Sequence, residues 1–286
     1  MRNLALFLAS GLLALSGCGG SSEGHVNFDI TDAPADGASS IVVEFTGITA
    51  TPAEGAPVHY SYPRPLQLDM ATLHSGVAAS LLQNLQLPAG HYKSLTLEVS
   101  ATAGAHDSFL VDATGKHALV LKGNAMTVPG GFDVQADAGN SYVIDLDLRR
   151  SVLPGSAGDF QLAPRLRMLD ERAAGNIVGS VPGDLASAAG CVPVVYVYRG
   201  IVAHPQDLRL TAAADPAQPV TEAPVQMETN FGAFRFTAAF LPAGTYTLAF
   251  TCGAGNDDPS QPDAIAFSPV GSVIAEAGTT TLTALH

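Results

Sequence analysis

The sequence predicts a mainly β protein made of two β-sandwich-like domains. Short runs of alternating apolar and polar residues recur along the chain, and Gly, Pro, Asn or Asp bounds each run. No long helical period follows residue 90. With 47% hydrophobic residues, the chain carries enough apolar side chains to fold rather than to remain disordered.

The first 17 residues have the pattern of a lipoprotein signal peptide. After the basic Arg2, residues 4–15 form an uncharged apolar run that is too short to cross a bilayer as a helix but suits a signal-peptide core. The Leu-Ser-Gly-Cys tetrad that ends at Cys18 resembles the lipobox of bacterial lipoproteins, in which the cysteine becomes the acylated first residue. We expect residues 1–17 to be removed and Cys18 to carry the lipid. An ordinary signal peptide with a chance cysteine is the alternative.

The expected mature chain is acidic and tethered. Residues 18–25 comprise the lipidated cysteine and a short flexible segment. Once Arg2 is removed with the signal peptide, 12 Lys and Arg remain against 26 Asp and Glu, a net charge of −14. This field disfavours binding to nucleic acid or to anionic lipid, so we expect the lipid itself to hold the protein on the membrane. Gly19 lacks the Asp that resembles an inner-membrane retention signal, which favours the outer membrane of the cell envelope.

We expect the first domain over residues 26–172, with mostly β structure. Alternation predicts strands at residues 26–30, 41–48, 95–99, 118–121, 132–135, 142–148 and 160–169. Between them, apolar residues recur at every fourth position from Leu73 to Leu85. This spacing predicts one short helix over residues 71–86, in which Gly76 is unfavourable.

A charged cluster at residues 170–175 marks the expected start of a second, small β-sandwich domain over residues 173–286. Its strands are predicted at residues 176–181, 192–198, 207–211, 233–240, 245–252 and 272–285. The phrase Leu-Pro-Ala-Gly-x-Tyr occurs in both domains, at residues 87–92 and 241–246, and has the chemistry of a turn that leads into a strand. The alternation after the two copies differs by one residue, which indicates a bulge or a similarity limited to the turn. We interpret it as a shared turn and not as a duplicated domain.

The cysteines predict one disulfide. If Cys18 is lipidated, only Cys191 and Cys252 remain, and two such cysteines usually pair in an oxidising compartment. Closing a loop of about 60 residues stabilises a fold by roughly 4 kcal/mol in the chain-entropy model. Two buried thiols are the alternative. The chain has no C-x-x-C motif and no neighbouring His pair, which argues against a redox or zinc site.

Five phrases of the first domain occur in a fixed order. They are residues 30–34, 68–73, 87–92, 143–147 and 160–165. As a set they resemble a bacterial lipoprotein family known only as domain of unknown function 4382, over residues 25–172. The resemblance implies no catalytic residues, because none is established for that family. The C-terminal part is similar to carboxypeptidase-regulatory-like and transthyretin-like sandwiches at residues 175–181 and 241–246, which implies a non-enzymatic module.

The sequence offers no catalytic motif. It lacks G-x-S-x-G, H-E-x-x-H, a P-loop, a dinucleotide fingerprint and an EF-hand loop, and its eight His residues are scattered. We therefore expect a non-enzymatic, lipid-anchored envelope protein with a binding or structural role and no cofactor. A hydrolase whose site the fold assembles from distant residues is one alternative.

Two groups of charged residues have candidate roles. Alternation places Asp145 and Asp147 on one face of a strand, and Arg165 and Arg167 on one face of the next, which predicts a solvated cross-strand ladder of opposite charges. A Pro-rich loop near the C-terminus contains four side chains with hard oxygen atoms that could bind a structural calcium ion. They are Asn256, Asp257, Asp258 and Asp263. A plainly solvated acidic loop is the alternative.

A carbohydrate- or polymer-binding role needs exposed aromatic rings, and the chain has no Trp. Tyr60 and Tyr62 are the best candidates for a glycan-binding surface, followed by Tyr196 and Tyr198. Half-buried packing in a strand is the alternative for both pairs. The expected partners are thus the membrane, through the lipid, and an unidentified glycan or envelope protein.

Overall fold

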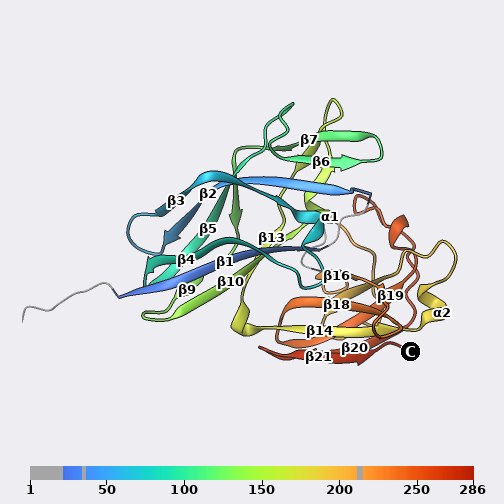
Figure 1. Cartoon of the computed structure of the whole chain (residues 1–286). Helices are drawn as coiled ribbons and strands as arrows, with labels where there is room; N and C mark the ends of the chain where they lie inside the picture. Colours follow the sequence, from blue (N-terminus) through green and yellow to red (C-terminus); the bar gives the residue numbers. More distant parts are fainter. Residues whose placement is uncertain (1–21, 34–36, 211–214) are drawn as a thin grey trace, which may run out of the picture.

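The computed structural model describes residues 22–33, 37–210 and 215–286, and these residues form four β-sheets arranged in two pairs (Figure 1). The prediction of a mainly β fold is confirmed. Cys18 and the predicted signal peptide lie outside the described residues. Within those residues, no helix is long and apolar enough to cross a membrane.

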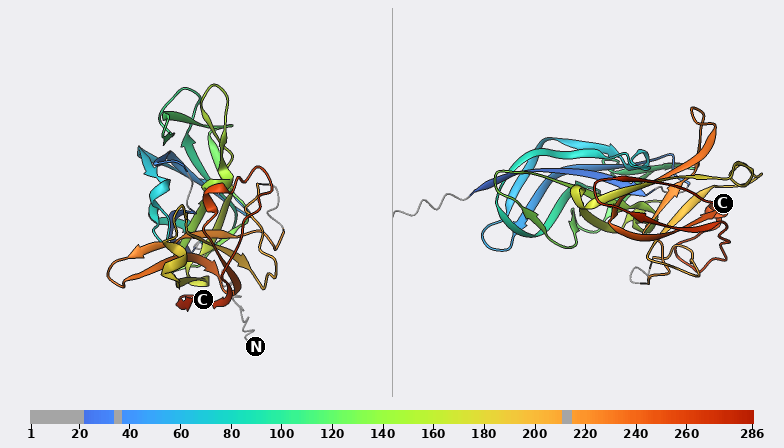
Figure 2. Two further views of the ribbon diagram at one scale, coloured as in Figure 1. Left: turned by 90° about the vertical axis from the view of Figure 1, so that its right-hand side faces the viewer. Right: turned by 90° about the horizontal axis from the view of Figure 1, so that it is seen from below.

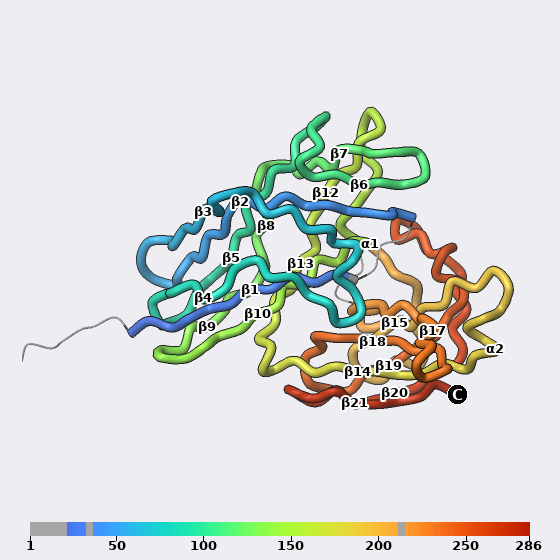
Figure 3. Tube along the Cα trace, viewed as in Figure 1, coloured from blue at the N-terminus to red at the C-terminus, as the bar shows by residue number. Residues whose placement is uncertain are grey.

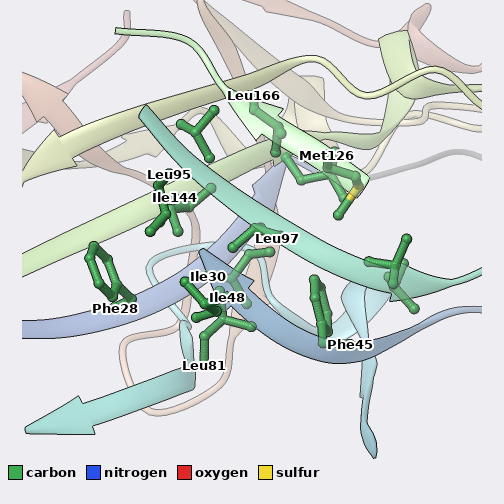
Figure 4. Close-up of a cluster of buried hydrophobic side chains, with 14 of the residues drawn as sticks. Phe28, Ile30, Phe45, Ile48, Leu81, Leu95, Leu97, Met126, Ile144 and Leu166 are labelled. Carbon is green, nitrogen blue, oxygen red and sulfur yellow. The ribbon is translucent and has the colours of Figure 1, made fainter. Parts of the chain in front are cut away.

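The first sheet pair contains all strands up to residue 170. Its smaller sheet has the order β13 (Leu166–Asp170), β10 (Gly139–Asp147), β1 (Glu23–Ala33) and β4 (Ala79–Pro88). Its larger sheet has the order β11 (Val152–Pro154), β12 (Phe160–Leu162), β7 (Gly115–Leu121), β6 (Phe109–Asp112), β2 (Ser40–Pro52), β5 (Gly90–Ser100) and β8 (Ala125–Val128), with β3 (Val58–Asp69) beside β2 and β9 (Phe132–Val134) beside β5. Apolar side chains of both sheets meet in one core, among them Phe28, Phe45, Leu97 and Ile144 (Figure 4).

The second sheet pair contains the strands from residue 174 onward. One sheet has the order β17 (Gln226–Glu228), β18 (Ala233–Pro242), β14 (Ala174–Val181) and β21 (Thr280–Ala284). The other has the order β16 (Thr221–Pro224), β15 (Val194–Arg199), β19 (Gly244–Thr251) and β20 (Val270–Ala275). A separate core lies between these sheets. The predicted disulfide is confirmed, because Cys191 and Cys252 are bonded with their Cα atoms 4.5 Å apart.

Short helical turns connect the strands. They are η1 (Met70–Thr72), α1 (Leu148–Ser151), η2 (Glu171–Ala173), α2 (Gly183–Ala186) and η3 (Ala254–Asn256). The turn η2 leads from the last strand of the first sheet pair into the second pair. Figure 2 shows that the two pairs lie along one elongated axis, and that β1 begins at the end far from the second pair.

The two sheet pairs share a core arrangement of five strands, although the first pair contains more strands. In the first pair, β1 runs antiparallel to β4 and parallel to β10, while β2 runs antiparallel to β5. In the second pair, β14 runs antiparallel to β18 and parallel to β21, while β15 runs antiparallel to β19. The interpretation of the repeated phrase as a shared turn alone therefore understated the similarity. The strands on either side of the turn are arranged in the same way in both sheet pairs.

The Leu-Pro-Ala-Gly-x-Tyr phrase forms the corner where the chain crosses between the sheets of each pair. It joins β4 to β5 and β18 to β19. The Tyr92 hydroxyl donates to the Pro88 carbonyl at 2.9 Å, and the Tyr246 hydroxyl donates to the Pro242 carbonyl at 2.6 Å. A bulge at residue 93 explains the one-residue difference in alternation, since Thr51 pairs with Ser94 whereas Pro52 pairs with Tyr92.

The helix predicted over residues 71–86 is wrong. The chain forms only the turn η1 there and then the strand β4. Because four is a multiple of two, residues spaced by four share a face of a strand as well as of a helix. Ser75 and Gly76 also have positive φ angles of 57° and 88°, which end any helical run. The strand predicted at residues 207–211 is likewise absent over 207–210, the part that the structure describes.

Candidate functional site

Two adjacent arginines occupy the junction of the sheet pairs. Arg149 and Arg150 belong to α1, a single helical turn that follows β10 and lies between the two pairs (Figure 3). Asp147 caps this turn by accepting from the Arg150 backbone N–H at 3.0 Å. Asp32 accepts from the Leu148 backbone N–H at 3.0 Å, which fixes the turn against β1. Only 4% of the Arg149 side chain and 9% of the Arg150 side chain are exposed.

Arg149 projects into the second sheet pair and, among the described residues there, hydrogen-bonds to three groups. Its Nη1 donates to Glu222 Oε2 at 2.5 Å and to the Tyr196 hydroxyl at 3.0 Å. Its Nη2 donates to the Asp257 carbonyl at 2.9 Å. These contacts join strands and loops that are separated by 47 to 108 residues in the chain. We call this set of contacts the arginine clasp.

Arg150 adds a second connection beside the clasp. Its Nη1 pairs with Asp147 at 2.7 Å, while its Nη2 and Nε donate to the carbonyls of Pro219 and Arg209 at 2.9 and 3.2 Å. Charged hydrogen bonds of this kind are stronger than neutral ones when they are buried. The two arginines therefore hold the sheet pairs in one relative orientation.

Burial dominates the electrostatics around the clasp. It raises the pKa of Glu222 to about 7, even though the Arg149 guanidinium favours the ionised carboxylate. Burial also raises the pKa of Asp257 and that of the Tyr196 phenol, whose hydroxyl donates to Asp257 Oδ2. One oxygen of each carboxylate, Glu222 Oε1 and Asp257 Oδ1, is buried without a hydrogen-bond partner. Such oxygens are costly to leave unpaired.

An acidic cluster adjoins the clasp. It consists of Asp207, Asp257 and Asp263, each of which offers an oxygen within 4.8 Å of the others. The structure thus unites two of the four residues predicted as calcium ligands with one that was not predicted. Asn256 and Asp258 are exposed outside this cluster, and the Asp258 side chain accepts from the Ser260 backbone N–H at 2.9 Å.

A groove of about 800 Å³ runs along the same junction. Its walls carry apolar groups such as Leu166 and Val220, together with Arg165 and Arg199. Both arginines are exposed, and neither has an ion-pair partner within the described part of the chain. The groove therefore presents two available positive charges, and one exposed carboxylate of its lining, Asp215, lies among them without an ion-pair partner in the described residues.

The predicted charge ladder is half confirmed. Asp145 faces Arg167 across β10 and β13, and the two side chains pair at 2.6 Å. Asp147, however, pairs with Arg150 instead of Arg165. The prediction that these carboxylates lie on a solvated face is wrong for Asp145, which is 4% exposed because the second sheet pair covers this side of the junction.

The predicted aromatic surfaces lie in two different settings. The Tyr60 and Tyr62 rings are half-buried on β3 and contact edge to face, and the Tyr62 hydroxyl donates to the Leu81 carbonyl at 2.8 Å. Tyr196 and Tyr198 are fully buried, so the interpretation of this second pair as a surface is wrong. Their strand, β15, has five consecutive buried residues because the loops after β15 and β19 cover its outer face.

Sequence reasoning missed Arg149, Arg150, Asp207 and Glu222. The one available signal was the Arg-Arg pair directly after an apolar strand. Two adjacent charged residues at the end of a strand are typical of a capped turn or of a junction between units. Asp207 and Glu222 carry no such local signal. The fold alone brings them to the junction.

Fold and junction together define a protein of two sandwich-like units joined by buried arginines. Residues 23–164 match the family model described as Domain of unknown function (DUF4382). The match includes every strand of the first sheet pair except β13. No curated protein has a sequence that matches the chain.

Solved structures give only distant likenesses. The Bacillus anthracis TIE protein matches with 12% identity and a TM-score of 0.22 over 92% of this chain, which spans about a third (34%) of that protein. The minor pilin GBS52 of Streptococcus agalactiae matches with 10% identity and a TM-score of 0.20, covering 91% of this chain and 94% of the pilin. The fimbrial anchor protein Mfa2 of Porphyromonas gingivalis matches with 10% identity and a TM-score of 0.22, covering 88% of this chain and 99% of that protein.

Proposed function

We propose that this is a lipid-anchored protein of the bacterial cell envelope that binds a partner without catalysis. The observation that carries the proposal is the junction, where the arginine clasp fixes two sheet pairs and a groove with two available arginines lies beside it. A rigid groove can bind with little ordering cost. Its apolar walls and positive charges suit an extended protein segment that carries acidic side chains.

The expected anchor fits the shape of the molecule. Cys18 precedes the start of β1 at Glu23 by five residues, a span of at most about 18 Å. A lipid at Cys18 holds the first sheet pair next to the membrane, and the second pair then projects away from it (Figure 2). This placement leaves the groove at the junction open to partners.

Intact-mass spectrometry of the protein extracted from its native membrane tests the anchor. We expect a chain that begins at Cys18 and carries the added mass of fatty acyl groups. The Cys18→Ser variant should remain unprocessed and unacylated. Native material that retains residues 1–17, or that begins elsewhere without lipid, contradicts the anchor.

A fluorescent peptide of alternating Glu and Leu tests the groove. We expect it to bind the detergent-solubilised protein, with affinity that falls at least about tenfold in the Arg165→Glu/Arg199→Glu variant. The same peptide with Lys in place of Glu should not bind. Arg64→Glu/Lys93→Glu is the matched control, since it reverses the same number of charges at two exposed residues outside the groove lining. Equal binding by all three proteins, or none by the unmodified protein, contradicts the groove as the binding site.

A further inference from the structure

We propose that Asp207, Asp257 and Asp263 bind a calcium ion that fastens two long loops of the second sheet pair together. Asp207 lies in the segment between β15 and β16, and the other two lie between β19 and β20. Only 3% of the Asp207 side chain and none of the Asp257 side chain is exposed. The proposal is independent of what binds in the groove.

A buried oxygen without a partner points to a cation here. Asp257 Oδ2 accepts from the Tyr196 hydroxyl and, at 3.2 Å, from the Leu208 backbone N–H. Its other oxygen, Oδ1, is buried and has no hydrogen-bond partner. Buried carboxylate oxygens are normally paired or bound to metal, so this oxygen is available as a ligand for a cation.

The charges at the junction also fit a divalent ion. Four carboxylates gather there, namely the acidic cluster and Glu222. Two guanidinium groups face them: Arg149 contacts Glu222 and lies 3.7 Å from Asp257, and Arg209 lies 3.3 Å from Asp207. With all groups ionised, two negative charges remain, which one calcium ion neutralises.

Calcium suits this ligand set better than magnesium or zinc. All ligands are hard carboxylate oxygens, and no His or Cys joins the cluster within the described residues. Loops from two segments give an adaptable geometry, and the half-buried Asp263 leaves room for water in the coordination shell. Magnesium requires a more rigid octahedral arrangement.

Bound calcium should also strengthen the clasp. Asp257 offers its carboxylate to the cluster and its backbone carbonyl to Arg149. Fixing the Asp257 loop therefore fixes one of the three groups that Arg149 holds. The ion links the surface loops to the orientation of the sheet pairs.

Thermal unfolding of the mature, detergent-solubilised protein tests the site, with calcium, magnesium or EDTA each at about 1 mM. We expect calcium to raise the melting temperature by a few degrees, magnesium to raise it less, and EDTA to reverse the rise. Isothermal titration with calcium chloride should give one site per chain. In Asp263→Asn, the calcium-induced rise should disappear. In EDTA the same variant should melt at or above the unmodified protein, since it relieves repulsion between carboxylates.

Asp258→Asn is the matched control. It removes the same charge from the same loop, outside the cluster, and its side chain can still accept from Ser260. We expect it to keep the calcium-induced rise. The proposal is overturned if calcium neither binds nor stabilises the unmodified protein, if Asp263→Asn keeps the full rise, or if Asp258→Asn loses it equally.

Discussion

Glu222 shows how strongly the junction depends on single side chains. It is buried against Arg149, and burial places its pKa near 7, compared with about 4.5 for an exposed glutamate. Between these values the folded protein holds a proton that the unfolded chain has released. The stability that this proton contributes is complete below about pH 4.5 and is lost as the pH rises through 7.

We therefore expect the free energy of unfolding to fall by about 3 kcal/mol between pH 4.5 and 8 because of Glu222. Urea titrations in EDTA, which removes any effect of metal ions, measure this change. Glu222→Gln keeps an acceptor for Arg149 but does not titrate, so its stability should vary less over this interval. Identical pH dependence in the two proteins would show that Glu222 does not titrate as described.

Some residue contacts could be predicted from the sequence, and others could not. Strand alternation predicted a ladder of Asp145 and Asp147 against Arg165 and Arg167, and one such pair, Asp145 with Arg167, forms, because period-two patterns determine which side chains share a face. The cysteine count gave the disulfide. The clasp could not be predicted, because its partners come from segments up to 108 residues apart and depend on how the sheet pairs pack. Local pattern contains no information about that packing.

At the scale of elements, the two Leu-Pro-Ala-Gly-x-Tyr corners are the most informative feature. Gly90 and Gly244 have φ angles of 147° and 153°, a region that other residues rarely adopt. Each corner also ties its tyrosine hydroxyl to the carbonyl of the preceding proline. The sequence pattern predicts a turn at each corner. It does not predict that the chain passes from one sheet to the other there, because only the strand pairing reveals that crossing.

We expect Gly90→Ala and Gly244→Ala each to destabilise the fold by about 1 to 3 kcal/mol in urea titrations. The cause is backbone strain, because an added Cβ has open space at both positions. Gly139→Ala is the control, since that glycine also has open space but no positive φ, and it should change stability little. If the three variants are equally stable, the corners do not require glycine.

At the scale of the whole molecule, the junction decides whether the sheet pairs behave as one body. Their cores are separate, and no strand ladder among the described residues crosses from one pair to the other. The sequence predicted two units but not their shared topology, because few residues recur between them beyond the corner phrase.

We expect Arg149→Met to destabilise the protein by about 3 to 5 kcal/mol, because Glu222 and Asp257 stay buried without their guanidinium partner. Calorimetry should then resolve two unfolding transitions, and X-ray scattering should show a broader range of shapes. Arg165→Met, at an exposed arginine without an ion-pair partner in the described chain, should change neither measurement. A single transition for Arg149→Met would show that the sheet pairs stay coupled without the clasp.

The arrangement of the clasp has a mechanical consequence. If the first sheet pair is anchored as proposed, a pull on the second sheet pair passes along the short link at η2 and through the Arg149 contacts. Side-chain contacts yield to solvent sooner than long backbone ladders do. Under tension the two units should thus part before either one unravels, and they should rejoin when the force is released.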